Sequence, residues 1–257
     1  ASTWLTRALA REGAPMTLSD PPILTDVVSY RLAGAAPAQA RALLDDVLGL
    51  LSRPFTLGEA VIVKAGAIGN SLGIDILAGR PSSKALCLHA PLPVYLASAA
   101  RKGVWGRICG RKLFATLRSA GLTDIGFTPD ELFEQSDLQI AADAWLILHR
   151  VMGEVGSRFG ERVRATDSES LFTRTAAAIG AIALHFGLAI DAAANAAGPL
   201  FRRHAKSGVE FDSGRGAQEA REGIAVHGEE IEMITKWARM VADAQSIRME
   251  LPGKLEL

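Results

Sequence analysis

Residues 59–90, EAVIVKAGAIGNSLGIDILAGRPSSKALCLHA, determine the fold that we expect for this chain. The apolar, β-branched run 59–65 and the similar run 84–90 are typical of strands buried in a parallel sheet. Between them, residues 68–79 predict a helix that stops at Gly79. Two strands separated by a helix indicate a parallel pair joined by a crossover. We therefore predict a parallel sheet with helices on both faces.

The flanking segments continue this alternation. Upstream, we predict a helix over 3–11, a short strand over 16–20 closed by Pro21-Pro22, and a helix over 37–53 with a proline in its first turn. Downstream, the predicted elements are a helix over 91–103, a helix over 128–160 capped by Thr128, a strand over 162–171, a helix over 171–188 that ends near Gly187, and an amphipathic helix over 217–247. No repeat or linker divides the sequence. We predict a single α/β domain over residues 1–257, with three α/β/α layers and a helix-rich second half.

The composition limits the classes of function. The chain has 28 Lys and Arg against 28 Asp and Glu, so no net charge attracts it to nucleic acid or to a membrane surface. No apolar run reaches the roughly 20 residues that a membrane span needs. The two cysteines, Cys87 and Cys109, fit a reducing compartment, and we expect a cytoplasmic protein. His149, His185 and His227 lack metal-ligand spacing, so no metal site is expected.

Basic residues are concentrated in one window of the sequence. Between Asp75 and Asp124 there is no acidic residue, whereas eight cations occur there: Arg80, Lys84, Arg101, Lys102, Arg107, Arg111, Lys112 and Arg118. One interpretation is a solvated helix face. The other is a site for an anion, such as a phosphate or sulfate group.

The segment STWLTRAL, residues 2–9, predicts a helix that begins on two hydroxyl residues. Helix N-termini attract phosphate groups through their unpaired N–H groups and dipole. The segment resembles the end of the phosphosulfate-binding loop in P-loop sulfotransferases, which transfer a sulfuryl group from 3′-phosphoadenosine-5′-phosphosulfate (PAPS). The resemblance implies a P-loop NTPase-like fold, in which Ser2 and Thr3 contact the 5′-phosphate. It also implies that the family's first strand and the cationic part of this loop precede Ala1.

Two further segments resemble the catalytic parts of this family. Residues 61–70, VIVKAGAIGN, resemble the strand whose lysine lies by the transferring group, which implies that role for Lys64; Gly66 stands where many relatives have a histidine. Residues 17–22, TLSDPP, resemble a Glu-Pro turn of some bacterial members, which implies that Asp20 is the general base. The alternatives are that Lys64 only ends a strand at the solvent edge, and that Asp20 forms an Asx-turn or caps the next helix.

Segments 84–103 and 200–208 resemble the parts of the family that bind the 3′-phosphate. In the first, His89 stands in place of the usual arginine, and Ser98 lies one residue later than expected. In the second, a basic loop supplies four candidate residues: Arg202, Arg203, Lys206 and Gly208. The alternatives are a buried histidine at a strand end, a serine on a packed helix face and a solvated surface loop.

The resemblance implies transfer of a sulfuryl group from PAPS to a hydroxyl or amine of a small-molecule or glycan acceptor, without a metal. A P-loop kinase or another nucleotide-binding α/β enzyme is an alternative, which would need a Walker lysine before Ser2. A non-catalytic relative that keeps the fold is a third interpretation, favoured by His89 and Gly66. The helix over 217–247 either completes the fold or packs on a partner, such as a second copy of the chain.

Overall fold

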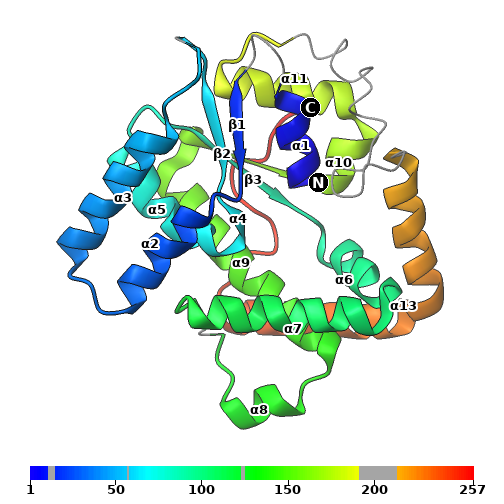
Figure 1. Cartoon of the computed structure of the whole chain (residues 1–257). Helices are drawn as coiled ribbons and strands as arrows, with labels where there is room; N and C mark the ends of the chain where they lie inside the picture. The colour runs from blue at the N-terminus through cyan, green and yellow to red at the C-terminus, as the bar shows by residue number, and fades with distance from the viewer. Residues whose placement is uncertain (11–14, 57, 123–124, 191–212) are drawn as a thin grey trace.

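The computed structural model describes residues 1–10, 15–56, 58–122, 125–190 and 213–257, and its strands form two parallel pairs (Figure 1). β1 (Met16–Ser19) pairs with β2 (Val61–Lys64), and Met16 lies opposite Val61. β3 (Ala85–His89) pairs with β4 (Val163–Asp167), and Ala85 lies opposite Val163. The predicted strands and their parallel direction are confirmed. The prediction of one continuous sheet is wrong for the described residues, because no ladder joins β2 to β3.

One face of the strands is covered by α1 (Ser2–Leu9), α10 (Ser168–Thr173) and α11 (Thr175–Phe186) (Figure 1). α11 ends at Gly187, which adopts the left-handed conformation (φ 70°) that glycine tolerates best, as predicted. The helices bury one apolar cluster, to which both strand pairs contribute. Its main members are Trp4, Leu5, Leu9, Leu171, Ile179 and Ile182, with Ile62 of β2 and Leu86 and Leu88 of β3 packed against them.

The other face is covered by helices that follow β1 and β2. They are α2 (Pro22–Leu32), α3 (Pro37–Leu51), α4 (Gly66–Gly69), a 3₁₀ turn (Asn70–Leu72) and α5 (Gly73–Gly79). The helix predicted over 68–79 is therefore divided into three short pieces. Val63 of β2 packs against a cluster that includes Leu24, Leu44 and Leu72, whereas Cys87 of β3 packs against a second cluster, which includes Leu77. Helices thus lie on both faces of the strands, in a mixed α/β arrangement.

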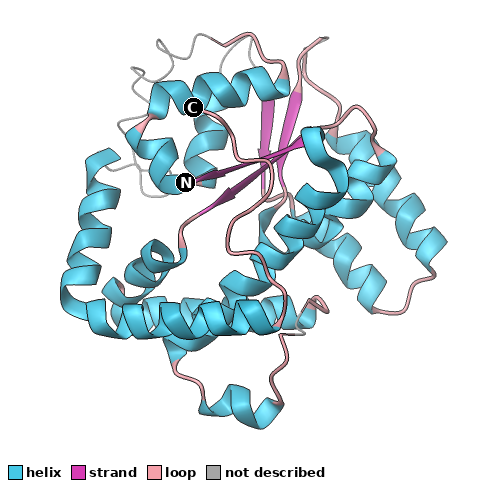
Figure 2. Cartoon of the chain, turned by 180° about the vertical axis from the view of Figure 1, so that it is seen from behind, coloured by secondary structure: helices cyan, strands magenta, loops and turns pink. Residues whose placement is uncertain are grey.

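A separate layer of helices is formed by residues 92–119, 137–159 and 213–244 (Figure 2). α6 (Leu92–Arg101), α7 (Gly103–Ser119), α9 (Asp137–Phe159) and α13 (Ser213–Ala244) enclose a core that includes Leu96, Leu117, Leu146 and Ala238. The helix predicted over 128–160 is two helices, α8 (Pro129–Glu134) and α9. Thr128 caps the first, as predicted, and Ser136 caps the second with Gln139.

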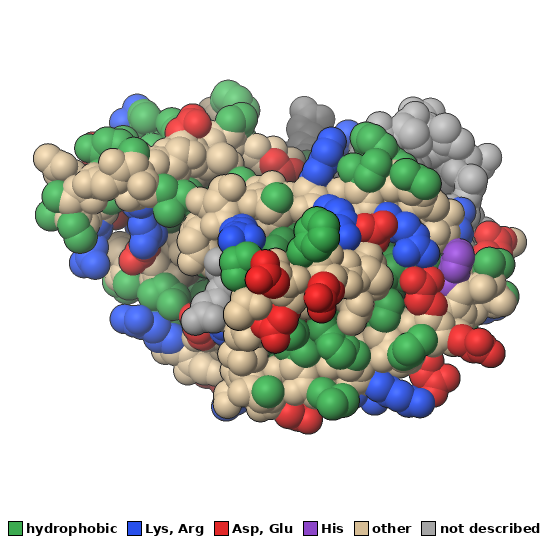
Figure 3. Space-filling view, turned by 90° about the horizontal axis from the view of Figure 1, so that it is seen from below, with side chains coloured by type: hydrophobic (Ala, Val, Ile, Leu, Met, Phe, Trp, Pro, Cys, Tyr) green, Lys and Arg blue, Asp and Glu red, His purple; other side chains and the backbone are tan. Residues whose placement is uncertain are grey.

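The C-terminal helix α13 completes this layer. It bends at His227, whose backbone is not helical (φ −120°, ψ 18°). Its inner face buries Ile231, Ile234 and Ala238 against the layer, while Val226, Met233 and Met240 remain exposed. On the molecular face seen in Figure 3, apolar side chains are interspersed with charged ones. Pairing of two chains through this helix stays a prediction, and none of the helices described has the length and apolarity to cross a bilayer.

A segment near the C-terminus lies along the edge of β4 that faces away from β3. The Ala165 N–H donates to the Gly253 carbonyl (2.8 Å), and the Leu255 N–H donates to the Ala165 carbonyl (2.7 Å). At its end, β4 passes directly into α10, where the Asp167 carboxylate accepts a hydrogen bond from the Ser170 N–H (2.8 Å). The strand predicted over 162–171 therefore stops at Asp167, because this aspartate acts as a helix cap.

The central strands are less buried than their sequences predict. Every residue of β2 and β3 is only half-buried, although both runs are almost wholly apolar. In β4, by contrast, Val163 and Ala165 are 1% and 3% exposed. The difference has a physical cause: β4 has neighbours on both edges, whereas β2 and β3 each have one partner strand among the described residues.

Candidate functional site

The candidate site is centred on Lys64, the last residue of β2. Its ammonium donates a hydrogen bond to the Thr3 hydroxyl (3.2 Å) and forms an ion pair with the Asp20 carboxylate. The Asp20 N–H in turn donates to the Lys64 carbonyl (2.8 Å), so the backbone holds the two residues together at the strand ends. The structure thus brings together three residues that the sequence singled out from separate segments.

The N-terminus of α1 lies against the same strand ends. The Thr6 hydroxyl is 3.1 Å from the Ser19 hydroxyl and also lies within hydrogen-bond distance of the carbonyls of Ser2 and Thr3. No side chain caps the helix, and its first turn contains no acidic residue. Ser2 and Thr3 therefore place uncapped N–H groups and the positive end of a helix dipole beside the Lys64 ammonium. This edge of the molecule suits an anion.

Asp20 takes an unusual backbone conformation, with φ at 51°. α2 begins after Pro21 and has no side-chain cap, so the alternative that Asp20 caps this helix is wrong. Gly66 also has a positive φ (72°), and a Cβ atom there would lie 2.8 Å from the Asp20 Oδ1 atom. Gly66 is therefore the residue that leaves room for the Asp20 carboxylate.

A pocket of about 260 Å³ opens beside Asp20. Polar groups reach it from three elements: the Asp20 carboxylate, Thr25 of α2 and Thr116 of α7, and the remaining walls are Pro21, Ala65, Gly66, Ala67 and Ile68. The Asp20 side chain is 53% exposed, so its carboxylate is accessible to a ligand. A carboxylate with two nearby threonines suits a hydroxyl-bearing molecule. The sequence analysis did not identify Thr25 or Thr116, because no local motif marks them.

His89 lies at the end of β3, opposite Asp167 at the end of β4. Its ring meets His149 edge-on (4.8 Å between centroids), and His149 stacks on Trp145 (3.5 Å). Burial lowers the pKa of His89 below its usual value, although the Ala90 main chain and the Asp167 charge oppose the shift. Burial and the neighbouring His89 lower the pKa of His149 to about 3. Both rings are therefore neutral near pH 7, which favours the alternative of a buried histidine at a strand end.

The other predicted residues are not joined to this site by a described contact. Ser98 is half-buried on α6, one residue after Ala97, which packs closely against Gly223 of α13. The basic loop lies outside the described residues, so the role of its four members stays a prediction: Arg202, Arg203, Lys206 and Gly208.

The cations of the basic window between Asp75 and Asp124 contact several different parts of the fold. Arg107 pairs with Glu230 of α13 (3.2 Å), and Arg111 pairs with Asp137 at the start of α9. Lys84 donates to the His185 carbonyl (2.7 Å). These three cations hold different elements together rather than converging on one point, which argues against a shared anion site for them.

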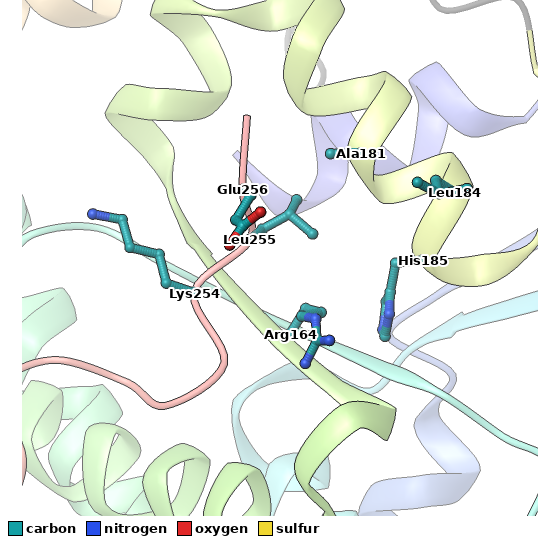
Figure 4. Close-up of a pocket in the computed structure, with 7 residues that line it drawn as sticks. All are labelled: Arg164, Ala181, Leu184, His185, Lys254, Leu255 and Glu256. Atoms are coloured by element: carbon teal, nitrogen blue, oxygen red, sulfur yellow. The ribbon is translucent and has the colours of Figure 1, made fainter.

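A second pocket, of about 440 Å³, lies near the start of β4 and is shown in Figure 4. Its basic groups are already engaged or turned away. Arg164 pairs with Glu161, and the His185 ring nitrogen lies 3.0 Å from the Ala85 carbonyl oxygen. Lys254 points away from the other lining residues in Figure 4. The pocket beside Asp20 is therefore the better candidate for chemistry.

The residues that combine charge, access and a neighbouring pocket are Lys64 and Asp20, at the carboxyl ends of adjacent parallel strands. In open α/β sheets, ligands bind at this edge. Thr3 adds a hydroxyl group and the start of α1. Comparison with known proteins gives no relative: no family model, no curated protein and no solved structure matches this chain.

Proposed function

We propose that this chain is a sulfotransferase with a P-loop NTPase-like fold, which moves a sulfuryl group from PAPS to a hydroxyl of a small molecule or glycan. One observation carries the proposal: the Lys64 ammonium lies between the start of α1 and the Asp20 carboxylate, which lines a pocket. An anion-binding end of a helix and a candidate base are thereby held on either side of one cation.

Lys64 has the capacity to bind a further group. An ammonium has three N–H donors, and among the described residues its partners are the Thr3 hydroxyl and the Asp20 carboxylate. The side chain is 17% exposed, which leaves its third donor a route to a ligand. The uncapped N–H groups of Ser2 and Thr3 would bind the same anion from the other side.

The chemistry requires two tasks, and the two charged residues suit them. Sulfuryl transfer, like phosphoryl transfer, has a loose transition state, so the protein mainly positions groups and stabilises charge. Lys64 would donate to the sulfuryl oxygens as the bond from sulfur to the bridging phosphate oxygen breaks. Asp20 would take the proton of the acceptor hydroxyl as its oxygen bonds to sulfur. The products are the sulfated acceptor and 3′,5′-adenosine bisphosphate.

The test is calorimetry with 3′,5′-adenosine bisphosphate and with ATP in the presence of Mg²⁺. We expect the bisphosphate to bind more tightly, and the Lys64→Met substitution to weaken its binding at least about tenfold, because a charge-assisted hydrogen bond is lost. Lys254→Met is the matched control, since this lysine lies by the other pocket and should leave binding unchanged.

Each contrary outcome favours a different alternative. Tighter binding of ATP with Mg²⁺ would indicate a P-loop kinase. Binding of neither nucleotide would indicate a relative that keeps the fold without the activity. If the bisphosphate binds, Asp20→Asn should preserve its affinity while abolishing transfer of labelled sulfate to a panel of phenols and sugars, because this change removes the base but not the cation.

A further inference from the structure

α7 and α8 follow one another in the chain and carry charges of opposite sign. α7 has four cations and no acidic residue, whereas the six-residue α8 has three acidic residues and no cation. Arg107 and Arg111 of α7 pair with residues of α13 and α9 rather than with α8. Asp130 and Glu134 of α8 are exposed and form no ion pair within the described part of the chain. These two carboxylates are therefore available to a positive surface outside their own chain.

α8 projects below α7 but is anchored to the rest of the molecule (Figure 1). A capping box fixes its first turn, and Leu132 packs against the core of the helical layer. The next residue, Phe133, is 88% exposed. Asp130 lies one turn before Phe133 and Glu134 directly after it, so a projecting aromatic ring is presented between two carboxylates. We call Asp130, Phe133 and Glu134 the α8 surface.

The start of α7 presents the complementary pattern. Val104, Trp105 and Ile108 are 74%, 63% and 39% exposed, while the opposite face of the helix packs into the core. Lys112 lies over the Trp105 ring, 5.6 Å from its centroid, and Lys102 immediately precedes the helix. Neither lysine forms an ion pair with a described carboxylate. These five residues, which we call the α7 surface, place an apolar patch between two cations.

We propose that two copies of this chain form a symmetric dimer, in which the α8 surface of each copy binds the α7 surface of the other. Phe133 would lie against Trp105, with the two carboxylates of the α8 surface beside the two lysines of the α7 surface. An aromatic centre with a charged rim is typical of protein interfaces, and charge complementarity favours this orientation. Around a two-fold axis the contact is made twice, which doubles the area that it buries.

A second copy is the partner that fits, because one chain carries both halves of the contact. Phe133 and Trp105 are both largely exposed, so the two surfaces do not cover one another within the chain. Large apolar side chains grouped with charge on a surface mark an interaction site more often than single ones do. The inference does not depend on sulfuryl transfer, because it concerns the side chains of α7 and α8 alone.

The exposed face of α13 suits pairing less well. Val226, Met233 and Met240 lie seven residues apart, which gives one apolar residue in every two turns. A seam between two helices needs two apolar positions in each heptad. On α13, the charged residues Glu229 and Lys236 stand three positions after Val226 and Met233. Pairing through α13 is therefore an outcome that the experiment must distinguish.

Charge reversal in two chains tests the dimer. The first chain carries Lys102→Glu and Lys112→Glu, and the second carries Asp130→Lys and Glu134→Lys. Each alone would place like charges opposite one another, so we expect its dissociation constant, measured by sedimentation equilibrium, to rise at least about tenfold. Mixed in equal amounts, the two chains place unlike charges opposite one another at both contacts. We expect the mixture to form a heterodimer with an affinity close to that of the native dimer.

Phe133→Ala tests the apolar centre of the contact, and Met233→Lys is the control on α13. We expect Phe133→Ala to weaken the dimer at least about tenfold and Met233→Lys to leave it unchanged. Circular dichroism checks that every variant is folded.

A native chain that stays monomeric across a concentration series would overturn the proposal. A dimer that persists in both charge-reversed chains would do the same, as would two reversed chains that fail to associate when mixed. Loss of the dimer in Met233→Lys but not in Phe133→Ala would assign the interface to α13 instead.

Discussion

At the scale of single residues, the candidate site depends on a close approach between Gly66 and Asp20. Both have positive φ, and the space that a Cβ atom at position 66 would need is occupied by the Asp20 carboxylate. Lys64 and Asp20 could be chosen from the sequence because the segments that contain them, at the ends of predicted strands, resemble catalytic segments of P-loop sulfotransferases. The ion pair between Lys64 and Asp20 could not be predicted, because it depends on the register between β1 and β2.

We predict that Gly66→Ala displaces the Asp20 carboxylate and lowers the free energy of unfolding by about 2–3 kcal/mol, the sum of backbone strain and steric overlap. Gly34→Ala is the matched control: it has φ of 90° with no atom within 4 Å, so only strain of about 1 kcal/mol is expected. Urea denaturation measures both. An equal loss of unfolding free energy in Gly66→Ala and Gly34→Ala would show that the contact with Asp20 does not contribute to stability.

Asp143 gives a pH-dependent prediction. It is fully buried on α9 without a hydrogen-bond partner of normal geometry, and burial raises its pKa to about 8, against a weaker opposing effect of Gln135. Between about pH 4 and 8, the unfolded chain releases this proton and the folded chain keeps it, so the contribution of Asp143 to stability falls as pH rises. Asp143→Asn should therefore gain stability relative to the native chain across this window, by up to about 1.4 kcal/mol per pH unit.

The measurement is the free energy of unfolding at several pH values for the native chain and Asp143→Asn. Asp46→Asn is the control, since Asp46 is exposed on α3. The difference in unfolding free energy between Asp46→Asn and the native chain should not show this change with pH. A difference between the Asp143→Asn and native chains that stays constant from pH 4 to 8 would contradict the assignment of a protonated Asp143.

At the scale of elements, periodicity and turn residues predicted most helices and strands, because those signals are local. Two of the failures occurred where two signals compete. The apolar pattern runs through 128–160, yet the chain breaks at Ser136, where a second capping box starts α9. The run 162–171 reads as a strand, yet Asp167 caps α10. Whether a helix begins inside an apolar run depends on which hydrogen bonds the capping residue can form in the folded chain.

The Ser136 cap supplies a prediction at this scale. Its hydroxyl accepts from the Gln139 N–H (3.3 Å), and the Gln139 side chain accepts from the Ser136 N–H (3.0 Å). We expect Ser136→Ala to lower the free energy of unfolding by about 1 kcal/mol. Ser157→Ala, at an exposed position of the same helix, should have little effect. Thermal unfolding of the two variants side by side makes the comparison, and an equal Tm for both would contradict the capping role.

At the scale of the whole molecule, the sequence predicted parallel strands between helices but not how completely they are buried. Apolar runs such as 59–65 indicate that a strand has the character for burial on both faces. They do not show which neighbours complete its edges, since strand neighbours are set by pairings distant in sequence. The split between β2 and β3, and the C-terminal segment along β4, therefore had no local signal.

The C-terminal segment has a consequence for folding kinetics. Ala85 pairs with Val163, and Ala165 then bonds to Gly253 and Leu255, so the sheet of β3 and β4 with its edge segment is assembled from three distant parts of the chain. Contacts of such long sequence separation form slowly, because the entropy of closing large loops is lost before the pairing is gained. During refolding, the outer edge of β4 stays open until this late step, and dilute protein will therefore refold in better yield than concentrated protein.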